Sequence, residues 1–444
     1  MNLLPEQEYI INYLMKGILN IDVEMSTICL NDRYQFCFGT KILEINNAFF
    51  SKWNDEPLDY LHVNNIPKHC FYIVDPFHSQ QSLPVLYGDQ RMIIEEDYIY
   101  CGADIFASSF FMLTRWEELV IDKKDQYGRC DESEMLVVRE GIWERPIVNE
   151  YIRLLYDFLL HLGVQVSPCS HIFTPYLTHD IDDLFRYASI TNLVKNIAGD
   201  ILHRKSLICL GTTLKSYLLY RCGKIKDPFD TFDWLMDLSD QHGFKNAFYF
   251  KAAFKKEYDA TYDIRDKKVI DIINNILRRN HEVGFHPSKN TFHNSKQYKE
   301  EVKRLKDVFP LIRGGRQHFL LYDIPCTMRE WDNNGFEYDA GLGFAFRAGF
   351  RCGICYEYPF FDVCKREKLN LKIRPLIVME AALIRRVSPV DMEECMKRLA
   401  EIVHYYNGDY VFLWHNDNFF RPEVRPYSFV YENIVEYLRI LVNK

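Results

Sequence analysis

The sequence predicts an α/β fold in which a distorted or incomplete (β/α) barrel follows an N-terminal α+β region. Three short apolar segments, at 176–182, 282–286 and 410–415, each end in residues suited to catalysis or metal binding. Helical patterns precede the second and third segments, as in repeated βα units. Because a βα barrel gathers its functional side chains at the C-terminal ends of its strands, we expect these residues to meet at one site. The number of strand-like segments favours an incomplete barrel over a doubly wound sheet.

The first segment is Tyr176-Leu177-Thr178-His179-Asp180-Ile181-Asp182. If it is a strand, Asp180 and Asp182 project from the same face. Two carboxylates this close repel each other unless a cation lies between them or one of them is protonated. The pair therefore suits a hydrolase in which one Asp binds a divalent metal and the other takes a proton from water. The alternative is that Asp182 or Asp183 caps the next helix.

The second segment places His286 at the C-terminal end of a predicted strand. Apolar residues recur at helical spacing from Val269 to Leu277, and Asn280 is a typical helix stop. A helix therefore leads into this strand. We expect His281 to fix the turn between them, with its ring bonded to the backbone.

The third segment runs from Tyr410 to Trp414 and is followed by His415. The helix before it begins with Ser388 as N-cap and Pro389 at the first position, and Gly408 marks its end. This segment repeats the plan of an apolar strand that carries an imidazole at its end.

The N-terminal region shows strand-like alternation around 91–100 and predicted helices over 105–120 and 147–162. A proline at position 168 interrupts the pattern before the first barrel strand, and this predicts a domain boundary there. We therefore expect an N-terminal α+β domain over residues 1–168 and a barrel over residues 169–444.

Composition restricts the classes of function. Charged residues make up 26% and hydrophobic residues 48% of the 444 residues, as in ordinary globular proteins. A net charge of −8 with no basic cluster disfavours a nucleic-acid partner. No apolar run reaches the roughly 20 residues of a transmembrane segment. The sequence starts without a signal-peptide pattern, and its 13 cysteines, an odd number, suggest no disulfide framework, so we expect a cytoplasmic location with reduced thiols.

The motifs occur in the order of those in the NodB-like polysaccharide deacetylases, carbohydrate esterase family 4, which the region from about residue 172 to the end resembles. The matching residues are Thr178-His179-Asp180-Ile181-Asp182, His281-Glu282-Val283-Gly284-Phe285-His286, Gly314-Gly315-Arg316-Gln317-His318, Asp339 and Leu413-Trp414-His415. The N-terminal region, with its segment Ile105–Glu118, resembles the extension of a bacterial subgroup associated with surface-polysaccharide synthesis.

This resemblance implies a role for each matching residue. Asp182 and His286 would bind one divalent metal. Zinc is the most suitable metal, because it commonly binds one oxygen and one nitrogen ligand of this kind. Asp180 would be the general base, paired with Arg316. His415 would be the acid that protonates the departing amine, and Asp339 would orient its imidazole.

Two departures from the family pattern affect the expected metal site. Ile181 separates the two carboxylates, so Asp183 could take the place of Asp182, although period-two alternation favours Asp182. The family places a second histidine four residues after the first, and here Asn290 holds that position. Asn290 would bind through oxygen, a weaker zinc ligand than imidazole; otherwise His293 or water would provide the third ligand.

The expected function is a metal-dependent N-deacetylase that acts on an acetylated sugar, glycan or glycan precursor in surface-polysaccharide synthesis. One alternative is a catalytically silent carbohydrate-binding or assembly protein on the same fold. Another is a metal-dependent hydrolase of a C–N bond outside sugars.

Overall fold

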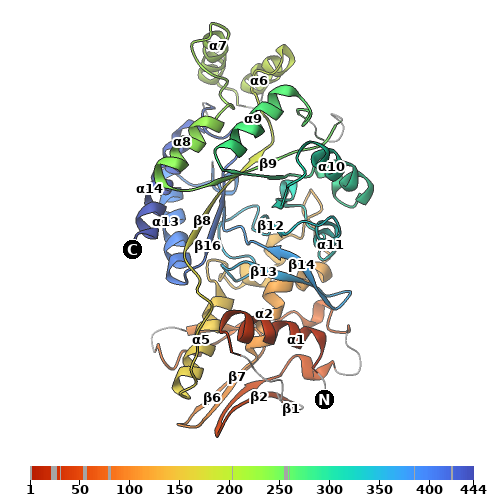
Figure 1. Ribbon diagram of the computed structural model, residues 1–444, viewed down its shortest axis with the longest axis vertical. Helices are drawn as coiled ribbons and strands as arrows, with labels where there is room; N and C mark the ends of the chain where they lie inside the picture. The colour runs from red at the N-terminus through yellow and green to blue at the C-terminus, as the bar shows by residue number, and fades with distance from the viewer. Residues whose placement is uncertain are drawn as a thin grey trace. The chain divides into compact units, whose positions relative to one another are not determined.

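The computed structural model describes residues 3–21, 28–30, 32–53, 58–78, 82–202, 204–254, 259, 261–384, 386–421 and 424–444. The chain divides into two compact units, both drawn in Figure 1. Unit 1 contains residues 1–172, 322–337 and 349–375, and unit 2 contains residues 173–321, 338–348 and 376–444. The division predicted at residue 168 concerns which parts fold independently, and it stays a prediction.

Unit 1 is a mixture of helices and mostly antiparallel strands. Its main sheet has the order β1-β2-β3-β7-β6, in which β3 and β7 are parallel and the other pairs are antiparallel. Two further antiparallel pairs are β4–β5 and β13–β14. The strands are β1 (Ile28–Leu30), β2 (Arg33–Phe38), β3 (Lys41–Asn46), β4 (Phe71–Val74), β5 (Ser82–Val85), β6 (Gly88–Ile94), β7 (Tyr98–Ala103), β13 (Tyr358–Asp362) and β14 (Glu367–Ile373).

The helices of unit 1 contribute many of its buried apolar side chains. They are α1 (Pro5–Ile11), α2 (Ile105–Thr114), α3 (Trp116–Val120), α4 (Leu136–Arg139), α5 (Ile147–His161) and α11 (Cys326–Asn333). All the residues of α2 are buried. The helix predicted over 105–120 is divided into α2 and α3 at Arg115, which has a left-handed backbone with φ of 52°. The helix predicted over 147–162 is confirmed as α5.

Unit 2 is built on a parallel sheet with the order β12-β11-β10-β9-β8-β16-β15. Its strands are β8 (Thr174–Ile181), β9 (Asn246–Phe250), β10 (Glu282–Phe285), β11 (Gly314–Gly315), β12 (Tyr338–Asp339), β15 (Val378–Met379) and β16 (Asp409–Leu413). Apolar side chains such as Phe248, Phe250 and Phe412 are fully buried, as expected for a sheet covered on both faces. The architecture is mixed α/β with a curled, open sheet, which is compatible with a distorted barrel.

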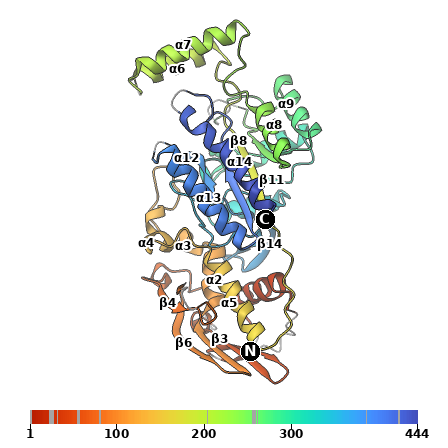
Figure 2. The same ribbon diagram turned by 90° about the vertical axis from the view of Figure 1, so that its left-hand side faces the viewer.

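Helices connect these parallel strands, as βα units require. They are α6 (Ile190–Leu202), α7 (Leu207–Arg221), α8 (Phe232–His242), α9 (Lys267–Arg278), α10 (Ser295–Val308), α12 (Glu380–Leu383), α13 (Pro389–Tyr405) and α14 (Ser428–Val442). Figure 2 shows α13 and α14 side by side, in contact with each other. The predicted N-cap of α13 is confirmed, because Ser388 Oγ accepts a hydrogen bond from Asp391 N at 3.1 Å.

The turn before β10 also has the predicted form. Helix α9 ends at Arg278, and Asn280 has a left-handed backbone with φ of 60°. His281 Nδ1 accepts a hydrogen bond from Asn246 N at 3.0 Å. The imidazole therefore ties the start of β9 to the start of β10, away from the C-terminal ends of the strands.

Candidate metal centre

Thr178 and Asp180 of strand β8 direct their side chains to the same side of the sheet, as period-two alternation predicts. Arg316 donates to Asp180 Oδ1 and to Thr178 Oγ1, both at 2.7 Å. Thr178 and Asp180 must therefore share a face of β8. Both are buried, and Asp182 follows directly after the strand. The side chain of Asp182 is 30% exposed, so the group is accessible from solvent.

Arg316 reaches β8 because the strands between them approach closely. It directly follows β11, and its Nε donates to the carbonyl of Ala340 at 2.9 Å. A Cβ atom on Gly315 would lie 1.9 Å from the carbonyl oxygen of Phe285, so only glycine fits at this contact. Burial tends to raise the pKa of Asp180, but the Arg316 guanidinium outweighs it and holds the pKa below its usual value. Asp180 is therefore ionised at neutral pH.

His286 directs one ring nitrogen toward both aspartates. Its Nδ1 lies 2.7 Å from the carbonyl oxygen of Arg316, which can only accept, so Nδ1 carries the hydrogen. Its Nε2 then presents a lone pair 3.4 Å from Asp182 Oδ1 and 3.8 Å from Asp180 Oδ2. This Nε2 is buried and makes no hydrogen bond within the described part of the chain. An unsatisfied imidazole nitrogen beside a carboxylate is a typical metal ligand.

His318 completes a group of three possible ligands with Asp182 and His286. Its Nε2 lies 3.1 Å from Asp182 Oδ1, and its Nδ1 lies 2.8 Å from Asp259 Oδ2. Burial lowers the pKa of His318, but Asp182 and Asp259 outweigh this and raise it. Histidines that bind metals usually have such a carbonyl or carboxylate partner on the second ring nitrogen, and both histidines of this group have one.

The third member of this group differs from the sequence-based prediction. Asn290 lies in a short 3-10 turn, Lys289–Thr291, and His293 follows with φ of 55° and its ring 3.9 Å from that of Phe292. Among the described residues, His318 and not His293 joins Asp182 and His286. The reason is the backbone turn after Arg316, which returns His318 toward the end of β10. A role for Asn290 as a further oxygen ligand stays a prediction.

The three ligand atoms are spaced as a metal requires. Around a tetrahedral zinc with bonds of about 2.0–2.2 Å, the ligand atoms lie roughly 3.4 Å from one another. The distances from Asp182 Oδ1 to the two imidazole nitrogens are 3.4 and 3.1 Å. The donor set of one carboxylate and two imidazoles suits zinc and other first-row metals. The residues present therefore fit a divalent metal.

His415 lies near Oδ2 of Asp182, the carboxylate oxygen that does not face His286 and His318, and Glu380 orients its ring. Its Nδ1 lies 2.6 Å from Glu380 Oε1, and its Nε2 lies 3.9 Å from Asp182 Oδ2. Burial lowers the pKa of His415, but the Glu380 carboxylate outweighs it and raises the pKa to about 10. His415 is therefore protonated at neutral pH.

The carboxylate that orients His415 was predicted to be Asp339, and the structure places Glu380 there instead. Glu380 is fully buried at the start of α12, directly after β15. Asp339 Oδ1 accepts a hydrogen bond from Gly341 N at 2.9 Å, within the turn that follows β12. Strand β15 is adjacent to β16, so the carboxylate after β15 is the nearer one to the end of β16.

Lys251 is a second residue that the sequence analysis did not identify. It follows β9 directly and is buried, with its Nζ 3.5 Å from Asp182 Oδ1 and 3.3 Å from Asp259 Oδ2. Burial tends to raise the pKa of Asp182, but His318 and Lys251 outweigh it and hold the pKa well below its usual value. The signal in the sequence was the same as for the other motifs: a polar residue at the end of an apolar strand.

A cavity of about 650 Å³ lies beside this group and is lined by residues on several elements of unit 2. Asp183 and Tyr187 line it from the segment after β8, Asn192 and Tyr220 from α6 and α7, and Tyr262 from the segment before α9. Tyr262 OH also donates to the carbonyl of Ile181 at 2.8 Å, next to Asp182. The cavity therefore offers aromatic rings and polar groups, a combination that suits a sugar, and it approaches the candidate metal centre through Asp183, the residue next to Asp182.

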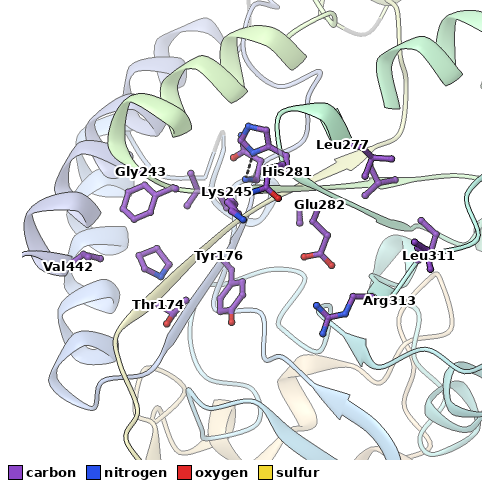
Figure 3. Close-up of a pocket in the computed structure, with 18 of the residues that line it drawn as sticks. Thr174, Tyr176, Gly243, Lys245, Leu277, His281, Glu282, Leu311, Arg313 and Val442 are labelled. Atoms are coloured by element: carbon purple, nitrogen blue, oxygen red, sulfur yellow. Dashed lines mark hydrogen bonds between the residues drawn. The ribbon is translucent and has the colours of Figure 1, made fainter. Parts of the chain in front are cut away.

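A larger cavity of about 840 Å³ lies at the opposite ends of the strands (Figure 3). It is lined by the first residues of β8, β9 and β10, including Thr174, Tyr176 and Glu282. His281, which ties β9 to β10, also lines it. The predicted catalytic residues are at the other ends of these strands, so we place the candidate site there and not in the larger cavity.

Residues 1–163 match a family described as a family of unknown function, DUF7033. A solved structure titled "Crystal structure of putative polysaccharide deacetylase from Mycobacterium smegmatis" is 14% identical, with a TM-score of 0.40. That alignment covers 62% of this chain and 86% of the other. No curated protein gives a significant match. Within the described residues, no helix has the length and apolar character to cross a membrane.

Proposed function

We propose that the protein is a metal-dependent N-deacetylase that hydrolyses the acetamide of an acetylated sugar in a glycan or glycan precursor. The observation that carries this proposal is the convergence of three groups around Asp182. The Asp182–His286–His318 group could hold the metal. Asp180 with Arg316 and His415 with Glu380 stand beside it. The motif resemblance of the sequence to the NodB-like deacetylases supports the same activity.

The two flanking pairs have the charge states that amide hydrolysis needs. A divalent metal, when bound, polarises an amide carbonyl and lowers the pKa of water. Asp180 has one oxygen held by Arg316 and the other facing His286, so an ionised oxygen is available to take a proton from water. His415 carries a proton on Nε2 that it can give to the departing amine, while Glu380 holds the Nδ1 side of the ring.

The proposal extends to the setting of the enzyme. We propose a carbohydrate substrate and a cytoplasmic location with reduced cysteines. Cys352 and Cys355 are fully buried, and burial raises the pKa of the Cys352 thiol to about 11, which makes it unreactive. Mass spectrometry after alkylation under native, oxidant-free conditions should find no disulfide between them. A stoichiometric disulfide would refute this setting.

Metal content and acetate release test the proposal together. The purified protein, dialysed against zinc at neutral pH, should retain divalent metal by mass spectrometry and release acetate from N-acetylglucosamine oligomers. His318→Ala should lose the metal and the activity, because it removes one of three ligands. His293→Ala is the matched control, and it should keep both. If the wild type binds no divalent metal, the deacetylase proposal fails.

One observation favours a silent glycan-binding protein as the second candidate. Lys251 already places a cation 3.5 Å from Asp182 Oδ1, which partly balances the carboxylate without a metal. Binding of acetylated oligomers without metal and without acetate release would support this candidate. Metal binding with hydrolysis of only non-sugar amides would support the third candidate, a hydrolase of other C–N bonds.

A further inference from the structure

Helices α6 and α7 expose their apolar side chains and bury polar ones. Only Asp200 in α6 and Thr213 in α7 are buried among their described residues. Ile190 is 73% exposed and Leu207 is 83% exposed. On α6 the exposed apolar residues Ile190, Val194 and Ile201 recur at the spacing of one helix face. On α7 the exposed apolar residues Leu207, Ile208, Leu214 and Leu218 cover a wider part of the helix surface. This is the reverse of the pattern of a helix that packs on a protein core.

Specific contacts fix the orientation of this hairpin, which we define as α6, α7 and the residues that follow α7, residues 190–226. Arg186 donates to Thr213 Oγ1 at 3.1 Å, and Tyr187 OH donates to the carbonyl of Thr213 at 3.3 Å. The ring of Tyr187 also contacts those of Tyr217 and Tyr220, with centroids 5.4 and 5.5 Å apart. Figures 1 and 2 show the two helices together at the edge of unit 2, beyond α8 and α9. These contacts hold the two helices with their apolar side chains exposed to solvent.

The same segment is strongly basic although the chain is acidic. Residues 190–226 contain seven Lys or Arg and one Asp, whereas the whole chain has a net charge of −8. This corrects the sequence-based expectation that the chain has no basic cluster, because the basic residues are spaced over the two helices and the residues between and after them and do not form a run. Four lysines of this segment are exposed: Lys195 on α6, Lys205 between the helices, Lys215 on α7 and Lys224 after α7.

We propose that the hairpin docks on the surface of an anionic lipid bilayer. Helices with an exposed apolar face and flanking Lys and Arg lie in the interface of such membranes, with the apolar side chains among the acyl chains and the cations at the headgroups. Contiguous exposed apolar surface is uncommon on a soluble protein, and the positive charge makes an acidic surface the complementary partner. Asn192 and Tyr220 of the hairpin also line the cavity beside the candidate metal centre, so docking would hold that cavity near the bilayer.

Vesicle sedimentation with the full-length protein tests the docking. The protein should sediment with vesicles of equal parts phosphatidylglycerol and phosphatidylcholine, and far less with phosphatidylcholine alone. Replacing Lys205, Lys215 and Lys224 with Gln should weaken binding about a hundredfold, since each surface cation contributes about a factor of five or more. Replacing Leu207 and Leu218 with Ser should weaken it at least tenfold.

Matched controls come from exposed residues elsewhere in unit 2. Replacing Lys296, Lys299 and Lys303 of α10 with Gln, or Val390 and Leu311 with Ser, should leave vesicle binding unchanged. Equal losses in the control and hairpin variants would overturn the proposal, and so would the absence of binding to anionic vesicles. A dimer that the Leu207→Ser, Leu218→Ser variant converts to a monomer, with vesicle binding unchanged, would assign the surface to a second copy and overturn it too. No step of this test uses deacetylase activity, so its result is independent of the proposed function.

Discussion

Asp180 and Asp182 leave the same strand two residues apart, yet their surroundings give them different tasks. Asp180 is buried against Arg316, whereas Asp182 lies among two imidazoles and Lys251. Asp180→Asn should therefore retain the metal but lose about a hundredfold to ten-thousandfold in kcat, the usual contribution of a general base. Asp182→Ala should lose metal and activity together. Metal content and kcat measured on the same samples check this, and equal metal loss in both variants would make Asp180 a ligand instead.

Glu380 controls the protonation of His415. The pKa of His415 is raised to about 10 because the Glu380 carboxylate outweighs the effect of burial. In Glu380→Gln the effect of burial is less opposed, so the pKa of His415 should fall and the alkaline limb of the pH–kcat profile should move to lower pH. NMR titration of the His415 ring gives the same readout without substrate. Asp339→Asn is the control, and a fall of the His415 pKa in that variant alone would restore the role predicted for Asp339.

Most of the site residues at strand ends could be predicted from the sequence, although Lys251 after β9 was missed, and residues placed by turns could not be predicted. Asp180, Asp182, His286 and His415 each end or follow an apolar strand, and the structure brings them together. His318 follows Arg316 by two residues and begins the short 3-10 turn His318–Leu320, which no local sequence pattern specifies. Asp259 comes from a segment between β9 and α9 whose sequence gives no signal of its position.

At the level of elements, glycines set the spacing of β10, β11 and β12. A Cβ on Gly315 would lie 1.9 Å from the Phe285 carbonyl oxygen, so Gly315→Ala must separate β10 from β11. We expect a loss of about 1–3 kcal/mol of unfolding free energy, and weaker metal binding because Arg316 and His286 move with these strands. Gly211→Ala in α7 is the matched control, since its Cβ meets nothing within 4 Å. Urea denaturation and zinc content check both variants, and equal effects would contradict the packing argument.

The N-cap of α2 makes the stability of unit 1 dependent on pH. Asp104 accepts hydrogen bonds from Ala107 N and Phe49 N, both at 3.0 Å, but its burial outweighs them and raises its pKa to about 7. The folded state therefore holds a proton that the unfolded state releases near pH 4. The contribution of Asp104 to stability is fully present below about pH 4 and is lost as the pH rises through about 7.

Asp104→Asn should remove this dependence, since the amide does not titrate and still caps a helix. The unfolding free energy of the wild type, measured by urea denaturation at several pH values, should fall between about pH 4 and 7 more steeply than that of the variant. Parallel curves for the two proteins would show that the Asp104 carboxyl is not perturbed.

Long, strongly patterned elements could be predicted, whereas short ones could not. Helices α5, α9 and α13 follow apolar periodicity and caps, and they match their predicted ranges closely. Strands β11 and β12 have two residues each, which is too short for any alternation to show. The break between α2 and α3 could not be predicted either. It lies at Arg115, whose side chain joins a buried network of ion pairs that depends on residues far along the chain.

At the scale of the whole molecule, unit 1 is completed by segments that follow most of the barrel sequence. Arg115 and Arg351 both bind Glu118, with Nε–Oε1 distances of 2.8 and 3.0 Å, and all three side chains are buried. Arg366 binds Glu6 at 2.8 Å, and Tyr9 OH donates to the carbonyl of Pro359 at 2.8 Å. Residues 1–168 alone therefore lack partners for charges that remain in their interior.

We accordingly expect the isolated segment 1–172 to lack a cooperative unfolding transition, although it contains the whole region that matches a family.

Removing one partner of a buried ion pair costs about 3–5 kcal/mol, so Arg351→Met in the full chain should lower the unfolding free energy of unit 1 by that amount. Lys365→Met is the control: its ion pair with Glu367 is about half exposed and should contribute less than about 1 kcal/mol. Circular dichroism with thermal and urea denaturation measures all three proteins. A segment 1–172 that unfolds cooperatively, with stability equal to that of the full chain, would show that unit 1 folds without residues 322–337 and 349–375 and would support independent folding of the predicted N-terminal domain.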